Sequence, residues 1–339
     1  MTHIDKNKMK QLWLVLTVTC FLTSCIKLYT PEMDRYEDLL VVDGGVNDGP
    51  GPYTVRISRS ARLEQKSSFI PYSKCKVTIK DDIGNLIPLN EYPAGNYFTD
   101  SVSLLGTAGR KYQLSILTPD GESYESEEEQ LTKGLGIQNV YAEQQHKTDP
   151  KLFFGRDGYQ FYVDTEMPDK NEQYLFWRVQ CTYKFKADLS ITSYYDNGTM
   201  HPVFEGDSLK TCYKTVDVLD FFMKNANNLK AAEVKRIPLN FEDNYTKALS
   251  IRYSLKVSQF TLNEKAYTYW SSIKKMMDEG GELYTQQPYQ IKNNLRNLTH
   301  PEKPALGYFM VAGLKEKRIF VNPPPIAFRY DVCTIESKS

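Results

Sequence analysis

The residues best suited to a defined chemistry lie near the N-terminus and end at Cys25. A basic segment over residues 6–10 precedes an apolar stretch over residues 12–22, and residues 22–25 read Leu-Thr-Ser-Cys. A branched apolar residue three positions before the cysteine and a small residue directly before it resemble the site of bacterial signal peptidase II, where the cysteine is acylated. We therefore predict a lipoprotein signal peptide over residues 1–24 and lipidation of Cys25.

The apolar stretch is too short to cross a bilayer. It covers about a dozen residues, whereas a spanning helix needs ~20. The sequence therefore predicts a protein that is anchored to a membrane by lipid, with residues 25–35 as a tether. Both Met1 and Met9 fit the start of such a signal.

Four cysteines follow Cys25 in the sequence, and each of them forms either a disulfide or a free thiol. An exported protein can form disulfides, and a Cys181–Cys212 bridge would close a loop of ~30 residues and stabilise the fold by ~3–4 kcal/mol. The alternative is two separate buried thiols. We expect Cys75 and Cys333 to be free thiols.

The chain lacks the sequence motifs of common catalytic sites. We find no GxSxG, HExxH, Walker A or GxGxxG pattern. No CxxC pair is present either, and the 4 histidines are scattered along the chain. We therefore expect no enzyme activity, no metal site and no cofactor.

The charge and aromatic content narrow the class of protein. Lys+Arg and Asp+Glu each number 42, and removing residues 1–24 takes away three lysines and one aspartate, which leaves a net charge near −2. This balance gives no basic surface for nucleic acid, so we expect no nucleic-acid partner. The chain has 24 Tyr and 16 Phe, which favour half-buried strand surfaces and predict a mainly β fold.

Residues 36–133 read as an N-terminal β-sandwich. Apolar and polar residues alternate at 53–58, 75–79 and 112–116, the period of a strand with one buried face. Turn signals follow, of which Asp-Gly at 120–121 is typical of a hairpin. Several short strands punctuated by turns predict an immunoglobulin-like or transthyretin-like sandwich.

Residues 134–339 read as a second β-rich domain with a helical insertion. Alternation at 159–163, 175–181 and 249–257 predicts the core strands of a second sandwich. A helix is expected near residues 262–279, because residues 261–264 (Thr-Leu-Asn-Glu) match a capping box that begins at the threonine.

One face of the expected helix is apolar. Ala266, Trp270, Ile273 and Met277 fall at helical spacing, which predicts packing against the core more readily than a ligand site. Two glycines at 280–281 supply its end.

Several segments in fixed order resemble one protein family. The segments at 41–44 (VVDG), 53–58 (YTVRIS), 120–126 (DGESYES), 267–270 (YTYW) and 306–309 (LGYF) are similar to the DUF4249 lipoproteins of Bacteroidetes. The resemblance implies an outer-membrane lipoprotein without an assigned activity, of a kind often encoded beside TonB-dependent transporters.

We therefore expect localisation at the outer membrane through the lipid anchor, on its periplasmic or its surface face. The expected function is an accessory ligand-binding or capping partner of a TonB-dependent transporter. The alternative is a structural or adhesive envelope lipoprotein with no role in transport.

Two further sets of residues are candidates for modification and binding. The pattern Asp-Ser-apolar at 100–102 and 207–209 matches the O-glycosylation pattern of exported Bacteroidetes proteins, which makes Ser101 and Ser208 candidate acceptors, although so short a pattern also occurs by chance. Four tyrosines could form an aromatic platform for a sugar or peptide, or could pack in the core instead. They are Tyr194, Tyr195, Tyr284 and Tyr289.

Overall fold

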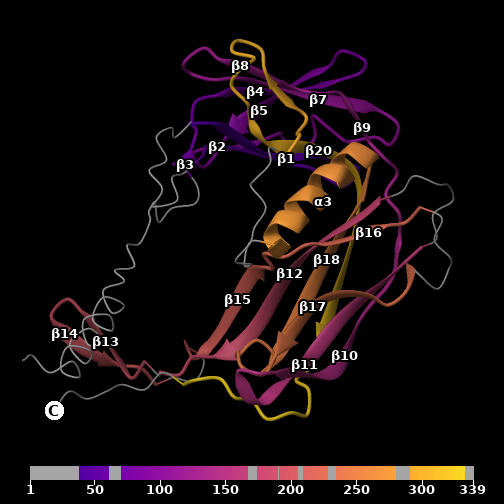
Figure 1. Ribbon diagram of the computed structural model, residues 1–339. Helices are drawn as coiled ribbons and strands as arrows, with labels where there is room; N and C mark the ends of the chain where they lie inside the picture. The colour runs from indigo at the N-terminus through magenta and orange to yellow at the C-terminus, as the bar shows by residue number, and fades with distance from the viewer. Residues whose placement is uncertain are drawn as a thin grey trace, which may run out of the picture. The chain divides into compact units, whose positions relative to one another are not determined.

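The computed structural model describes residues 38–60, 70–166, 174–189, 191–204, 209–227, 234–279 and 291–332. The expected signal peptide, tether and lipidated Cys25 lie outside these ranges. The described chain is mainly β, as the sequence predicts. A helix, labelled α3 in Figure 1, lies between β18 and β19 in the chain.

The first group of strands surrounds an N-terminal core. The strands of this group are β1 (Leu40–Asn47), β2 (Thr54–Arg59), β3 (Ile70–Pro71), β4 (Lys76–Asp81), β5 (Leu86–Glu91), β6 (Asn96–Phe98), β7 (Lys111–Leu117), β8 (Ser123–Ser126), β9 (Glu129–Gln130) and β19 (Leu295–Asn297). They pair in the order β1-β2-β6-β5-β4-β7-β8-β19, with β3 on β2 and β9 on β7.

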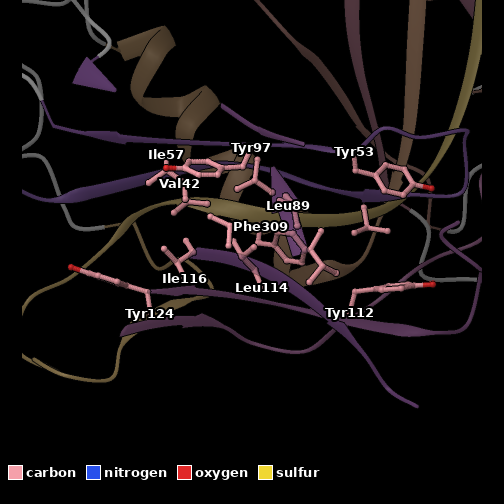
Figure 2. Packing of buried hydrophobic residues seen from close by; sticks show 14 of the residues in the cluster. Val42, Tyr53, Ile57, Leu89, Tyr97, Tyr112, Leu114, Ile116, Tyr124 and Phe309 are labelled. Atoms are coloured by element: carbon pink, nitrogen blue, oxygen red, sulfur yellow. The ribbon is translucent and has the colours of Figure 1, made fainter. Parts of the chain in front are cut away.

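Two layers of this sheet face each other across the N-terminal core (Figure 2). Ile57 and Tyr97 lie on one side and Leu114 and Ile116 on the other, all of them buried. Tyrosines of this core place their rings inside and their hydroxyls at the rim. The Tyr97 hydroxyl, for example, accepts a hydrogen bond from the Cys75 N–H at 3.0 Å and donates one to the Tyr72 carbonyl at 2.8 Å. The many tyrosines of this region are therefore core residues that also hold loops.

The second group of elements surrounds a C-terminal core. Its members are β10 (Ile137–Asp149), β11 (Leu152–Thr165), β12 (Tyr174–Lys186), β13 (Ser193–Asp196), β14 (Thr199–Pro202), β15 (Thr211–Asp217), β16 (Phe222–Asn225), β17 (Ile237–Asp243), β18 (Arg252–Leu262), α3 (Glu264–Glu279) and β20 (Leu306–Val321). A three-stranded sheet, β10-β11-β17, packs on β12 and β18. The stacked rings of Phe161 and Tyr253, 5.3 Å apart, lie in this core.

Strand β20 joins the two groups. Its residues 306–312 pair in parallel with β1, and its residues 313–321 pair antiparallel with β18. Phe309 and Val311 consequently belong to the N-terminal core, although they follow the C-terminal core in sequence, and Leu295 joins the same core through the pairing of β19 with β8. The expected two separate sandwich domains with a helical insertion are therefore not confirmed, because one continuous sheet connects the cores and the chain returns to the first core past the expected boundary at 133–134.

Strand β12 is buried on both faces, which explains its continuous apolar run. Leu175 and Trp177 point into the C-terminal core, whereas Phe176 points to α3, where its ring lies 5.2 Å from the Trp270 ring. The apolar face of α3 thus packs on the sheet as expected, except for Met277, which is 48% exposed. Among the described residues, no helix has the length and apolar character needed to cross a membrane.

Candidate functional site

Helix α3 begins with an asparagine cap. The Asn263 Oδ1 accepts a hydrogen bond from the Ala266 N–H at 2.8 Å and so satisfies a backbone donor of the first turn. The predicted cap at Thr261 is wrong, because Thr261 still belongs to β18 and its hydroxyl accepts from the Leu135 N–H at 2.9 Å. The Nδ2 of Asn263 is then free to donate to Glu129.

Glu129 is a buried carboxylate next to the start of α3. Its Oε1 accepts from the Tyr308 hydroxyl at 2.9 Å and from the Asn294 Nδ2 at 3.3 Å, while Asn263 donates to its Oε2. Asn294 in turn accepts from the Phe309 N–H at 3.0 Å. These donors compensate the desolvation of the carboxylate and fix the chain at residue 294 against the sheet and the helix.

An open cleft lies between α3 and residues 291–294. Its volume is about 480 Å³, within the range of ~300–1,000 Å³ that is typical of small-molecule sites. The described residues that line it are Glu127, Glu264, Lys265, Thr268, Tyr269, Ser272, Ile291, Lys292, Asn293, Asn294 and Tyr308. We refer to this site as the α3 cleft.

The α3 cleft combines a charged rim with protonated phenols. Lys265 Nζ lies 2.6 Å from Glu127 Oε2, and this bond lowers the pKa of Glu127 and raises the pKa of Lys265. Burial raises the pKa of Tyr269 to about 12 and also raises the pKa of Tyr308. Both phenols therefore remain protonated at neutral pH.

The described lining of the α3 cleft suits reversible binding. It offers amide, hydroxyl and charged groups beside the rings of Tyr269 and Tyr308, whose centroids are 4.8 Å apart. The sequence did not point to this cleft, because its residues come from four separate segments that only the fold brings together.

Two of the four platform tyrosines lie on the β13–β14 hairpin. Tyr194 and Tyr195 are 54% and 71% exposed, and the Tyr194 ring stacks on His201 with centroids 5.1 Å apart. Tyr284 and Tyr289 lie outside the described residues. The four-tyrosine platform therefore stays a prediction, and the two described tyrosines do not line the α3 cleft.

The predicted Cys181–Cys212 disulfide is not formed. Strands β12 and β15 pair antiparallel, and Cys212 lies opposite Phe185, four positions from Cys181. That offset is ~13 Å along a strand, well beyond the ~7 Å between Cα atoms that a disulfide tolerates. Both cysteines are free thiols, as is Cys75, while Cys333 lies outside the described residues.

The O-glycosylation candidates are only partly described. Ser101 lies in an exposed turn after β6, where the Asp100 Oδ1 accepts from the N–H groups of Val102 and Ser103, each at 2.7 Å. Ser208 lies outside the described ranges. Modification of either serine stays a prediction.

An acidic group that sequence reasoning missed lies at the edge of the C-terminal core. Glu242 on β17 has its Oε2 3.4 Å from the Tyr253 hydroxyl, and the Thr246 hydroxyl donates to its Oε1 at 3.1 Å. Burial raises the pKa of Glu242, and it also raises the pKa of the Cys181 thiol. The β11–β17 pairing contains a register shift, and such a bulge alters which side chains face the core, so alternation could not reveal Glu242.

The chain matches a known protein family. A family model described as a domain of unknown function, DUF4249, matches residues 26–318. The match covers most of the chain, in agreement with the resemblance carried by its short segments. No curated protein matches the chain.

Proposed function

The chain belongs to the DUF4249 family, and from this premise we propose that it is a lipid-anchored outer-membrane protein that serves a TonB-dependent transporter as an accessory ligand-binding or capping partner. In this proposal the protein acts by binding, without catalysis, metal or cofactor. Its partners are the outer membrane, through the lipid, and the transporter.

The observation that carries the proposal is the Leu-Thr-Ser-Cys sequence at residues 22–25, behind a basic and an apolar segment. Acylation of Cys25 with two or three chains would hold the protein durably on a membrane, whereas a single chain binds only marginally. Attachment to the outer membrane would bring the folded part close to outer-membrane barrels.

The α3 cleft supports the binding part of the proposal. It is large enough for a small ligand, and the protonated phenols of Tyr269 and Tyr308 with the Lys265–Glu127 pair offer donors and acceptors for polar groups. The donors around Glu129 hold the cleft walls together, and preorganised walls favour affinity.

The β13–β14 hairpin favours the second candidate function, a structural or adhesive envelope protein. An isolated two-stranded hairpin is marginal in water, and Tyr195 and Met200 are exposed on it. Exposed apolar and aromatic side chains of this kind are typical of contact surfaces. The gene next to this one distinguishes the two functions, since a TonB-dependent receptor there favours transport and its absence favours the structural role.

The two cores also form part of this proposal, as separate folding units. We infer that the N-terminal core, as an immunoglobulin-like or transthyretin-like sandwich, and the C-terminal core behave as two folding units on one sheet. Hydrogen exchange in increasing urea should then release their amides at different urea concentrations. Release of both sets in one step would contradict two units.

Substitution of the predicted acyl acceptor tests the anchoring directly. Cys25→Ala should move the protein from the outer-membrane fraction to the soluble envelope fraction and remove the mass of the acyl chains. Cys20→Ala, five residues earlier in the apolar segment, is the matched control and should leave both unchanged. A Cys25→Ala protein that still sediments with outer membranes would contradict the proposal.

A further inference from the structure

One face of the sheet formed by β15, β12, β18 and β20 is open to solvent beyond the end of α3 (Figure 1). Successive residues of β12 point to opposite faces, so that Trp177 lies in the C-terminal core and Phe176 lies against α3. The face that carries Phe176 continues past the helix. We refer to this continuation as the basic sheet face, formed by alternate residues within 178–184 of β12, 213–217 of β15, 252–258 of β18 and 316–320 of β20.

The basic sheet face sets cations directly opposite cations. The strand register pairs Lys184 with Arg252, and it pairs Lys256 with Arg318. Like charges opposite each other on one face destabilise a sheet. Lys256 is compensated by Glu316 at 2.8 Å, whereas Lys184, Arg252 and Arg318 form no ion pair with a described residue. The sheet therefore tolerates a repulsion that a bound anion would relieve.

The other charges of this face leave the surplus in place. Arg178 lies 3.9 Å from the Asp43 carboxylate of β1, and the Asp217 carboxylate accepts from the Gln180 Nε2 at 2.8 Å. The face thus carries five cationic side chains against two carboxylates of its own, Asp217 and Glu316. A surface with such a surplus attracts the opposite charge.

Two exposed aromatic rings border the basic sheet face. Tyr213 on β15 is 69% exposed, and Phe320 on β20 is 60% exposed. The Lys184 Nζ lies 5.9 Å from the centroid of the Tyr213 ring, and the Arg252 guanidinium lies 5.1 Å from the centroid of the Phe320 ring. Each side of the face therefore offers an apolar surface next to a positive charge.

Hydroxyl groups lie between the two rings. The Thr182 and Thr215 hydroxyls are 3.0 Å apart, and the Ser254 hydroxyl accepts from the Arg318 guanidinium at 2.9 Å. A hydroxyl both donates and accepts, so this row can exchange hydrogen bonds with hydroxyls of a ligand. Cations, rings and hydroxyls together fit a ligand that carries carboxylates and hydroxyls on compact rings.

The size and position of the basic sheet face favour a slender ligand. Four strands and the segment 178–184 give it dimensions of ~15 Å by ~20 Å, well below the ~800 Å² that each partner buries in a typical protein interface. Helix α3 packs on the same side, and its diameter of ~10 Å would meet a flat membrane before the sheet did. An extended peptide would find no backbone partners on the face, because β12 and β18 are paired on both sides.

We propose that the basic sheet face binds a linear anionic polysaccharide. Carboxylates along the polymer accept from Lys184, Arg252 and Arg318, and its sugar rings lie against Tyr213 and Phe320. The hydroxyl row bonds to the sugar hydroxyls. This inference depends on neither the lipid anchor nor a transporter partner.

Calorimetric titration with an oligogalacturonate as long as the face, and with its uncharged methyl ester, tests the proposal on the full lipidated protein in phosphatidylcholine nanodiscs. The free acid should bind at least about tenfold more tightly than the ester. Arg252→Gln and Arg318→Gln should each weaken binding of the free acid about fivefold, and the double variant should lose the preference. Because Arg252 is exposed and lies opposite Lys184, Arg252→Gln should fold and unfold at the same or a higher urea concentration.

Two controls distinguish this site from general attraction between opposite charges. Lys80→Gln, which removes an exposed lysine on β4, should leave the preference for the free acid unchanged. An oligoglutamate of the same charge should bind at least about tenfold more weakly than the oligogalacturonate. Equal binding of these two polyanions, equal binding of acid and ester, or a preference that survives the double substitution would each overturn the proposal.

Discussion

The two cores of this protein differ in where their buried polar side chains lie. The N-terminal core is built from aliphatic and aromatic side chains, and its tyrosines turn their hydroxyls to the rim. The C-terminal core encloses polar groups as well, because the fully buried Gln259 Oε1 accepts from Trp177 and from Thr165, each at 2.8 Å, and Glu242 lies at its edge. The first group of strands also buries Asp81 and Glu129, but these carboxylates accept from a turn and from loop residues, whereas Gln259 bonds to side chains on neighbouring strands of the second core.

The largest effect is expected where the two cores are joined. A Cβ on Gly45 would lie 1.7 Å from the Met310 carbonyl oxygen, so Gly45→Ala must push β1 away from β20. We expect a loss of about 3 kcal/mol or more in the free energy of unfolding, measured in urea. Gly109→Ala, whose Cβ would meet nothing within 4 Å but whose φ is +89°, is the control and should cost only about 1 kcal/mol. Equal losses would show that the close packing of β1 on β20 at Gly45 does not determine stability.

The next largest effect on stability is expected from a buried polar side chain of the C-terminal core. Gln259→Leu removes the oxygen that accepts from Trp177 and Thr165. It also removes the Gln259 Nε2, which donates to the Leu135 carbonyl at 2.6 Å in the parent. Two buried donors and the part-buried Leu135 carbonyl would lose partners, so the free energy of unfolding should fall by about 3 kcal/mol. Ile79→Val in the N-terminal core should cost about 1 kcal/mol. Similar losses for the two variants would remove the distinction between the cores.

A smaller effect tests the start of α3. Asn263→Ala removes both the cap on Ala266 and the donor to Glu129, and should destabilise the protein by about 1–2 kcal/mol in thermal or urea unfolding. Ser272→Ala, on the cleft side of the same helix, removes only an exposed hydrogen bond to the Thr268 carbonyl and should change stability by less than about 0.5 kcal/mol. A negligible change for Asn263→Ala would contradict its role as the cap.

The smallest effect is a change in pH dependence. The pKa of Glu242 is raised by burial in the folded state, so the folded protein binds the proton more tightly than the unfolded chain. This contribution is complete below the unfolded pKa near 4.5 and is lost as the pH rises through the folded pKa. Glu242→Gln should flatten the decline in stability as the pH rises above about 4.5, measured by urea unfolding at each pH. A decline as steep as in the parent would show that Glu242 is not responsible.

The same contrast explains what the sequence could predict. Val77, Ile79, Leu114 and Ile116 alternate with polar residues and lie in the N-terminal core, because a strand with one buried face must show a period of two. The helix was also predictable within about two residues of its observed bounds, Glu264–Glu279, although its cap was not.

Long-range pairing and local irregularity set the limits of that prediction. Phe309 enters the N-terminal core only because β20 pairs in parallel with β1, which no local pattern encodes. The register of β12 on β15 separates Cys181 from Cys212, and the spacing of cysteines in sequence carries no information on register. The α3 cleft likewise combines segments that are distant in sequence.

The most direct test of the proposed function is purification of the lipidated protein from its native outer membrane, with mass spectrometry of the proteins that accompany it. The account predicts a TonB-dependent barrel in near-equal amount with this chain, retained in the parent and lost together with membrane attachment in Cys25→Ala. A protein that is recovered alone, without any barrel, would contradict a transport role.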